Sequence, residues 1–162
     1  MKNIMISIEE EQKLEELCQY AFECARSDDT HTLKILLDSG LNVNLANQDG
    51  NTLLMLAAYN GNLNATRLLL QRGADANKLN DKALSPLAGV CFKGYYEIAT
   101  LLVEYGADVQ SKNAMGLSPM NCALMFGRKE FVKLFAKHTG GKLKLNGWQK
   151  FCAWLYGVRF AK

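Results

Sequence analysis

Residues 84–110 read LSPLAGVCFKGYYEIATLLVEYGADVQ, and this stretch holds the start and end signals of two consecutive helices. Ser85 before Pro86 predicts a helix start, because the hydroxyl can accept from an unpaired backbone N–H and proline has no N–H to leave unpaired. Gly94 and Gly106 predict helix ends, since glycine adopts the left-handed conformation without steric cost. Apolar residues with helical spacing lie between the two glycines: Ile98, Leu101 and Leu102.

The same signals recur at intervals of 33 residues on both sides of this stretch. A fixed period of this length indicates a repeat protein, in which each unit buries its apolar face against the next unit. Small residues continue the first helix of each unit, as in Ala57-Ala58 and Val90-Cys91, and they let neighbouring helices approach closely. The series that share the period are Gly40, Gly73 and Gly106; Gly61, Gly94 and Gly127; and Thr52, Ser85 and Ser118.

The chain resembles the ankyrin repeat family from about residue 19 to residue 141, through its Gly-Ala-Asp segments after the second helix and its Ser-Pro openings. The resemblance implies an all-α ankyrin repeat solenoid of helix-turn-helix units with projecting hairpin loops, closed by N- and C-terminal capping helices. Two departures stand out. Leu53 replaces the proline usual in the family, and Ala83 replaces the loop glycine, which leaves the shape of that loop open.

A length of 162 residues fits a single domain. The repeat period divides this domain into a capping helix with a degenerate first repeat, three regular repeats and a truncated closing repeat. The predicted boundaries are 7–46, 47–79, 80–112, 113–141 and 142–162, within one domain of residues 1–162.

Each end of the chain is expected to close the stack with a helix. At the N-terminal end, Ser7-Ile8-Glu9-Glu10 reads as a capping box that starts a helix running to about Ser27. Its apolar face is predicted to comprise Leu14, Leu17, Cys18 and Ala21.

At the C-terminal end, residues 152–157 repeat the pattern of residues 122–127. We interpret the helix that contains these residues as a cap, in which Trp148 and Phe151 cover the last repeat. The alternative interpretation is a basic, aromatic helix that contacts an anionic membrane or nucleic acid, because residues 142–162 carry five Lys and Arg and no acidic residue.

Composition excludes several other classes of protein. Apolar residues make up 49% and charged residues 22% of the chain, which argues against disorder and against membrane residence. The first 16 residues lack a long apolar run, so we expect no secretory signal, a cytoplasmic location and reduced cysteines. Five cysteines without a C-x-x-C pair predict neither disulfides nor a metal site. We expect neither a membrane nor a nucleic acid as partner. The free protein is expected to be monomeric.

Catalytic signals are absent from the sequence. His31 and His138 are expected at a helix start and a helix end, far apart in the stack. Residues 139–142 read Thr-Gly-Gly-Lys, but they lack the spacing of a phosphate loop and follow a helix. We therefore expect no enzymatic activity and no cofactor.

The resemblance implies a protein-binding module that uses a concave surface built from loop tips and first-helix sides. An adaptor or scaffold is the leading hypothesis; a haem- or metal-handling accessory to a redox enzyme such as catalase, and a microbial effector acting on a host protein, are alternatives. Along the stack, these contact positions change from polar to apolar. The predicted contact residues are Asp49, Asn51, Tyr59, Asn60, Asp81, Lys82, Leu84, Phe92, Lys93, Met115, Leu117, Met125 and Phe126. The closing helix could instead cover part of the apolar end.

Overall fold

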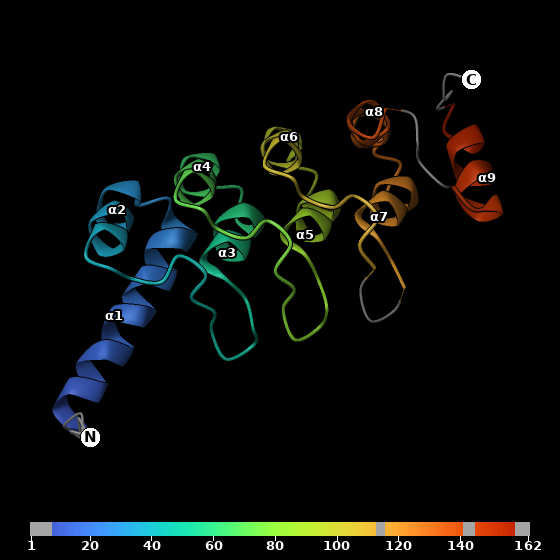
Figure 1. The fold of residues 1–162 in the computed structure, drawn as a ribbon. Helices are drawn as coiled ribbons and strands as arrows, with labels where there is room; N and C mark the ends of the chain where they lie inside the picture. Colours follow the sequence, from blue (N-terminus) through green and yellow to red (C-terminus); the bar gives the residue numbers. More distant parts are fainter. Residues whose placement is uncertain (1–7, 113–115, 141–144, 158–162) are drawn as a thin grey trace.

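The computed structural model describes residues 8–112, 116–140 and 145–157. Within these residues it contains nine helices, and its only β-type pairing there is an isolated bridge between Ala46 and Thr52 (Figure 1). The predicted all-α class is therefore confirmed. The helices span Ile8–Ser27 (α1), Thr30–Asp38 (α2), Leu53–Tyr59 (α3), Leu63–Gln71 (α4), Pro86–Lys93 (α5), Tyr96–Glu104 (α6), Pro119–Met125 (α7), Lys129–His138 (α8) and Gly147–Leu155 (α9).

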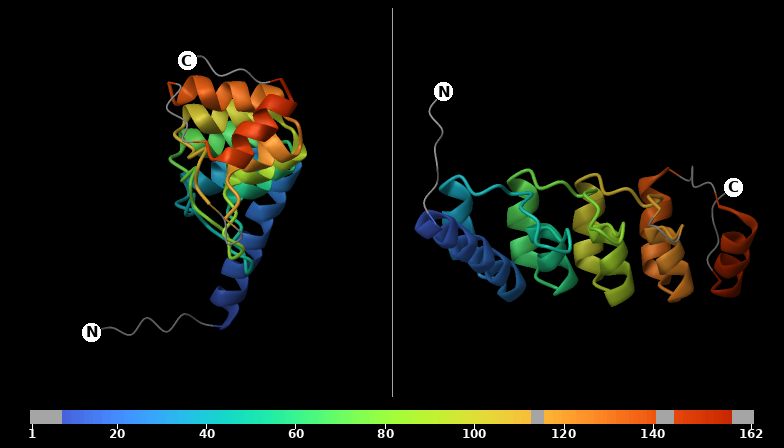
Figure 2. Two further views of the ribbon diagram at one scale, coloured as in Figure 1. Left: turned by 90° about the vertical axis from the view of Figure 1, so that its right-hand side faces the viewer. Right: turned by 90° about the horizontal axis from the view of Figure 1, so that it is seen from below.

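The helices are arranged as a row of antiparallel pairs. Helices α1, α3, α5 and α7 form one layer, and α2, α4, α6 and α8 form a second layer alongside it (Figures 1 and 2). Each helix packs on its pair partner and on the matching helix of the next unit, as α3 does on α4 and α5. Loops between the pairs project beyond the first-helix layer as finger-like hairpins (Figure 1). Helix α9 closes the row against α7.

Small side chains hold the first helices close together. Ala57, Ala58, Val90 and Cys91 are completely buried, as the sequence pattern predicted. Larger apolar side chains fill the space between the two helix layers. Leu69 and Leu102 are fully buried there, and they belong to one core cluster that extends through the stack. Each unit therefore buries its apolar surface against its neighbours.

The predicted helix starts and ends are present. The Thr52 hydroxyl accepts a hydrogen bond from the Met55 N–H at 3.1 Å, and the Ser85 hydroxyl accepts one from Ala88 at 3.2 Å. Gly94 ends α5 with φ at +89°. A methyl group on Gly94 would lie 2.7 Å from the Arg128 guanidinium carbon, so the next unit covers this helix end closely.

Asparagine side chains link neighbouring units at the outer turns. The Asn44 side-chain oxygen accepts from the Asp75 N–H at 2.8 Å, and the equivalent oxygen of Asn77 accepts from Asp108 at 2.7 Å. Asn77 also donates its amide to the Gly106 carbonyl at 2.9 Å. These side chains thus join the first unit to the second and the second to the third by polar contacts spaced at the 33-residue period.

The N-terminal helix differs from the prediction along half of its length. Helix α1 ends at Ser27 as predicted, while Ser7 of the proposed capping box lies outside the described residues. Ala21 is buried and Cys18 is partly buried, but Leu14 and Leu17 are exposed. The reason is length: α1 has 20 residues, and its N-terminal half extends past the neighbouring α3, which has seven (Figures 1 and 2).

The C-terminal cap forms, but with a different face than predicted. Asn146 and Gln149 make a capping box at the start of α9, and the Gln149 amide also donates to the Asn121 side-chain oxygen of α7. These bonds turn α9 so that Cys152 and Ala153 face the stack. The prediction that Trp148 and Phe151 cover the last repeat is therefore wrong, because both side chains are exposed.

We expect Asn77→Ala to lower the free energy of unfolding by about 1 kcal/mol, because it removes both hydrogen bonds to the following unit. Gln71→Ala is the control. Gln71 is exposed in α4 of the same repeat, and its side chain makes no hydrogen bond to any described residue. Urea denaturation measures both changes, and equal effects of the two substitutions would contradict the role of Asn77.

Candidate functional site

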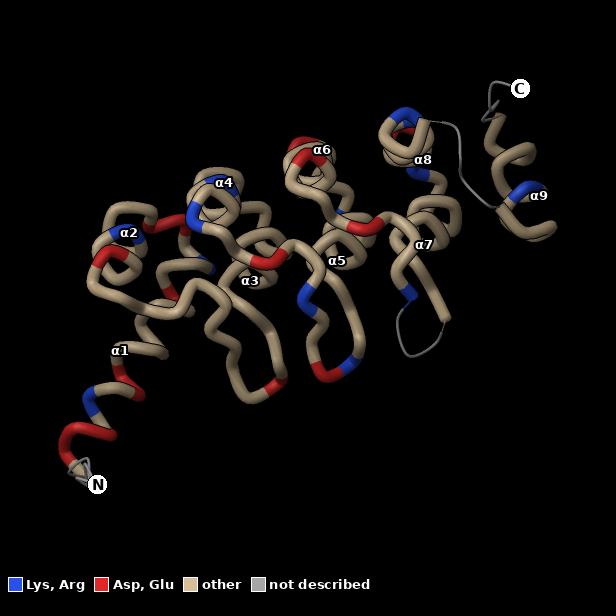
Figure 3. The backbone as a smooth tube through the Cα atoms, in the orientation of Figure 1, with Lys and Arg blue, Asp and Glu red and all other residues tan. Residues whose placement is uncertain are grey.

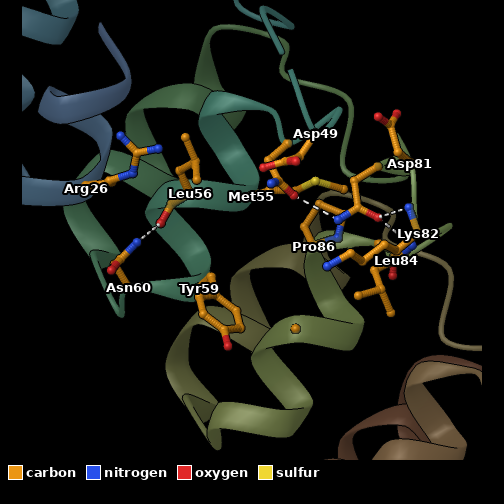
Figure 4. Close-up of a pocket in the computed structure, with 14 residues that line it drawn as sticks. Arg26, Asp49, Met55, Leu56, Tyr59, Asn60, Asp81, Lys82, Leu84 and Pro86 are labelled. Carbon is orange, nitrogen blue, oxygen red and sulfur yellow. Dashed lines mark hydrogen bonds between the residues drawn. The ribbon is translucent and has the colours of Figure 1, made fainter. Parts of the chain in front are cut away.

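A groove of about 480 Å³ lies between the projecting loops of the second and third repeats and the first helices behind them (Figure 4). Its walls come from three consecutive units. Helix α1 contributes Arg26, helix α3 contributes Tyr59, and the loop before α5 contributes Asp81. The remaining lining residues are Asp49, Asn51, Met55, Leu56, Asn60, Asn80, Lys82, Leu84, Ser85, Pro86 and Gly89.

The loop that forms one wall of this groove is built around Asn80. Its side-chain oxygen accepts hydrogen bonds from the N–H groups of Lys82 and Leu84 at 3.0 and 2.9 Å. Its amide donates to the Asn51 side chain in the preceding loop at 2.8 Å. Asn47 makes the same pair of bonds within that preceding loop, to the N–H groups of Asp49 and Asn51. Asparagine side chains favour turns, because they can accept a hydrogen bond from the backbone two residues further along the chain.

The loop that contains Ala83 has the same backbone turn as the preceding loop, although alanine replaces glycine there. The φ of Ala83 is +53°, in the left-handed region where Gly50 of the preceding loop has +73°. Alanine is strained there, because its Cβ approaches the following carbonyl oxygen. The hydrogen bonds of Asn80 hold the strained conformation, so the third repeat presents the same turn as its neighbour.

Aromatic residues form a second feature on the same face. Tyr59, Phe92 and Met125 occupy equivalent positions at the ends of three successive first helices, and all three are exposed. Phe92 and Phe126 pack edge to face, with ring centroids 5.2 Å apart and planes at 82°. The Lys93 ammonium lies 4.5 Å above the Tyr59 ring and links the aromatic positions of neighbouring repeats.

Ten of the thirteen predicted contact residues fall into two groups. Those from the second and third repeats line the groove, namely Asp49, Asn51, Tyr59, Asn60, Asp81, Lys82 and Leu84. The exposed side chains of Phe92, Met125 and Phe126 make up an apolar group towards the fourth repeat, and α9 does not cover them. Lys93 lies between the groups, Leu117 is partly buried, and Met115 lies outside the described residues.

Several groove residues were not predicted. Arg26 lies in the N-terminal capping helix, outside the repeats from which the contact positions were predicted. Met55 lines the groove although its side chain is almost completely buried. Asn80 did have a signal in the sequence, because asparagine recurs at positions 47, 80 and 113 with the repeat period. A series of this kind marks a side chain that shapes each loop rather than one that contacts a ligand directly.

A comparison with protein-family models finds a match to ankyrin repeats (3 copies) over residues 21–113. The chain belongs to the ankyrin repeat family. Ankyrin repeats are generally protein–protein interaction modules, which agrees with the expected class of function. A comparison with curated proteins finds no match. None of the described helices of this ankyrin chain is long and apolar enough to cross a membrane.

The histidines and cysteines of the ankyrin stack do not form a cluster. No group of three or more metal-ligating side chains occurs among the described residues. His31 and His138 are exposed at opposite ends of the stack. Burial raises the pKa of the Cys91 thiol well above its usual value and also raises the pKa of Cys122, so both thiols are neutral at pH 7.

We expect Ala83→Gly to raise the free energy of unfolding by about 0.5–1 kcal/mol, because it removes a left-handed alanine. Ala136→Gly within α8 is the control and should lower the free energy of unfolding by about 1 kcal/mol, since glycine weakens a helix interior. Thermal or urea denaturation gives both values. Destabilisation by Ala83→Gly would contradict the strain at this loop.

Proposed function

We propose that this ankyrin protein is a non-enzymatic adaptor or scaffold that binds one partner protein across the concave face of its second to fourth repeats. The observation that carries the proposal is the exposed aromatic pair Phe92–Phe126 beside the loop-lined groove. Exposed aromatic side chains on a rigid surface dominate the binding energy of many protein interfaces.

The aromatic pair is suited to be the anchor of such an interface. Each ring is fixed by edge-to-face contact with the other, so a partner that covers them need not order flexible side chains. Exposed Met125 lies beside the pair in the sequence and can adapt its shape to a partner. An apolar side chain of the partner is therefore expected to contact this group.

The groove would provide specificity. Asp49 and Asp81 are exposed on neighbouring loops, with Lys82 following directly and Arg26 on the opposite wall (Figure 4). Charges of both signs at a partly exposed interface select a partner with a complementary pattern more than they add affinity. The proposal therefore describes a partner segment with polar or charged groups in the groove and an apolar residue on the aromatic pair.

We expect Phe126→Asp and Phe92→Asp each to weaken partner binding by about thirtyfold or more, because a charge replaces an anchor ring. Affinity capture from the source cell, followed by mass spectrometry and a direct titration with the captured protein, measures this loss. Tyr105→Asp is the matched control, since Tyr105 is similarly exposed but ends a second helix, α6, away from the groove. Unchanged binding by folded Phe92 and Phe126 variants would exclude this face.

A haem- or metal-handling accessory function stays an alternative prediction from the sequence. It requires ligands among the histidines and exposed cysteines, and the groove does not supply a methionine ligand, since Met55 is almost completely buried. The effector hypothesis and the cytoplasmic location stay predictions.

If the protein handles haem, adding haemin should produce a shifted visible absorption band, and His31→Ala or His138→Ala should change that band. Tyr59→Phe serves as the control, because tyrosine is not among the ligands that this hypothesis requires. A spectrum identical to that of free haemin would exclude this candidate and leave the protein-binding proposal untouched.

A further inference from the structure

Helix α9 exposes a large apolar surface at the end of the stack. Its packed face consists of Gln149, Cys152 and Ala153. The exposed side chains are Trp148, Phe151, Trp154 and Leu155, with Trp154 at 74% exposure. Phe151 and Trp154 lie next to each other, with ring centroids 6.2 Å apart. Exposed apolar patches of this kind usually mark an interaction site.

The same end of the molecule is strongly basic. The described residues from 128 to 157 include five Lys and Arg, namely Arg128, Lys129, Lys133, Lys137 and Lys150, and a single acidic residue, Glu130. Helix α1, at the opposite end, is acidic and carries Glu9, Glu10 and Glu11 in its first turn. Figure 3 shows this separation along the stack, with basic positions in α8 and α9 and acidic positions in α1. Lys150 is exposed within α9 itself.

We propose that α9 binds to the surface of an anionic lipid bilayer, with its exposed tryptophans and Phe151 inserted among the headgroups and Lys150 near the lipid phosphates. Tryptophan is suited to this interface, because its ring is apolar while its N–H can remain hydrated. A short apolar face binds a membrane weakly, and nearby basic residues add the electrostatic attraction that stable binding needs. The helix lies in the interface and does not cross the bilayer, so the proposal takes up the alternative interpretation of the tail in place of the expectation that no membrane partner binds.

Charge favours this occupant over a second copy joined through the same surface. Two α9 ends brought together would place two basic regions against each other, which is unfavourable. A second copy could instead present its acidic α1, where Leu14 and Leu17 are exposed. In that contact the two leucines would pack on the aromatic side chains of α9, and nothing in it would require tryptophan. We therefore treat it as a competing outcome of the test.

The two tryptophans make the test direct. Both tryptophans of the chain lie in α9, so tryptophan emission reports on this helix alone. With vesicles of phosphatidylcholine and phosphatidylglycerol, we expect the emission to shift to shorter wavelength and the protein to sediment with the vesicles. Vesicles of phosphatidylcholine alone should give neither effect, and added salt should weaken the binding.

Paired variants separate the apolar and the basic contributions. Phe151→Asp and Lys150→Glu keep both tryptophans, and each should weaken vesicle binding by about tenfold or more. The matched controls are Ile35→Asp and Lys34→Glu on the exposed side of α2, at the opposite end, and they should bind as the wild type does. Circular dichroism and thermal melting establish that each variant is folded.

Three results would overturn the proposal. One is unchanged emission in the presence of anionic vesicles. Another is an equal shift with neutral and anionic vesicles, which would remove the role of charge. The third is a blue shift without vesicles that grows with protein concentration, together with a doubled mass in light scattering, which would identify a second copy as the occupant. None of these results tests the proposed binding of a partner protein at the concave face.

Discussion

Close approach of neighbouring first helices is the constraint on which this structure depends. It is possible only because small residues such as Ala57, Ala58 and Cys91 lie fully buried between the helices. Gly94 extends the close packing to the helix end, where its φ of +89° favours glycine and the Arg128 guanidinium of the next unit lies against it. Every other feature, including the row of loops and the groove between them, follows from units placed side by side at this short distance.

The repeated part of the fold was predictable because each unit has the same neighbours. The capping hydroxyls of Thr52 and Ser85 and the left-handed glycines have the same role in every interior repeat, so their spacing identifies the helices. At the ends this logic fails, because one neighbour is missing. Leu17 and Trp148 look like core residues in the sequence, yet no described residue buries them. Periodicity predicts an apolar face but does not reveal whether another element covers it.

The sequence predicted those parts of the candidate site that lie at equivalent positions in successive repeats. Positions 59, 92 and 125 were expected to be exposed at equivalent places, and they are. The ring contact between Phe92 and Phe126 depends on side-chain geometry across two units, which no single-repeat pattern contains. Arg26 was missed for a related reason, since it comes from a helix outside the period. Residues that act across repeat boundaries therefore require the three-dimensional arrangement.

The asparagine links between units have a consequence for how the molecule opens. Asn44 and Asn77 connect the first unit to the second and the second to the third, so the second unit is bonded to both of its neighbours. In a chain of nearest-neighbour contacts, local opening starts where the coupling is weakest. Amide hydrogens in the second repeat should consequently exchange with solvent more slowly than those of the closing helix α9.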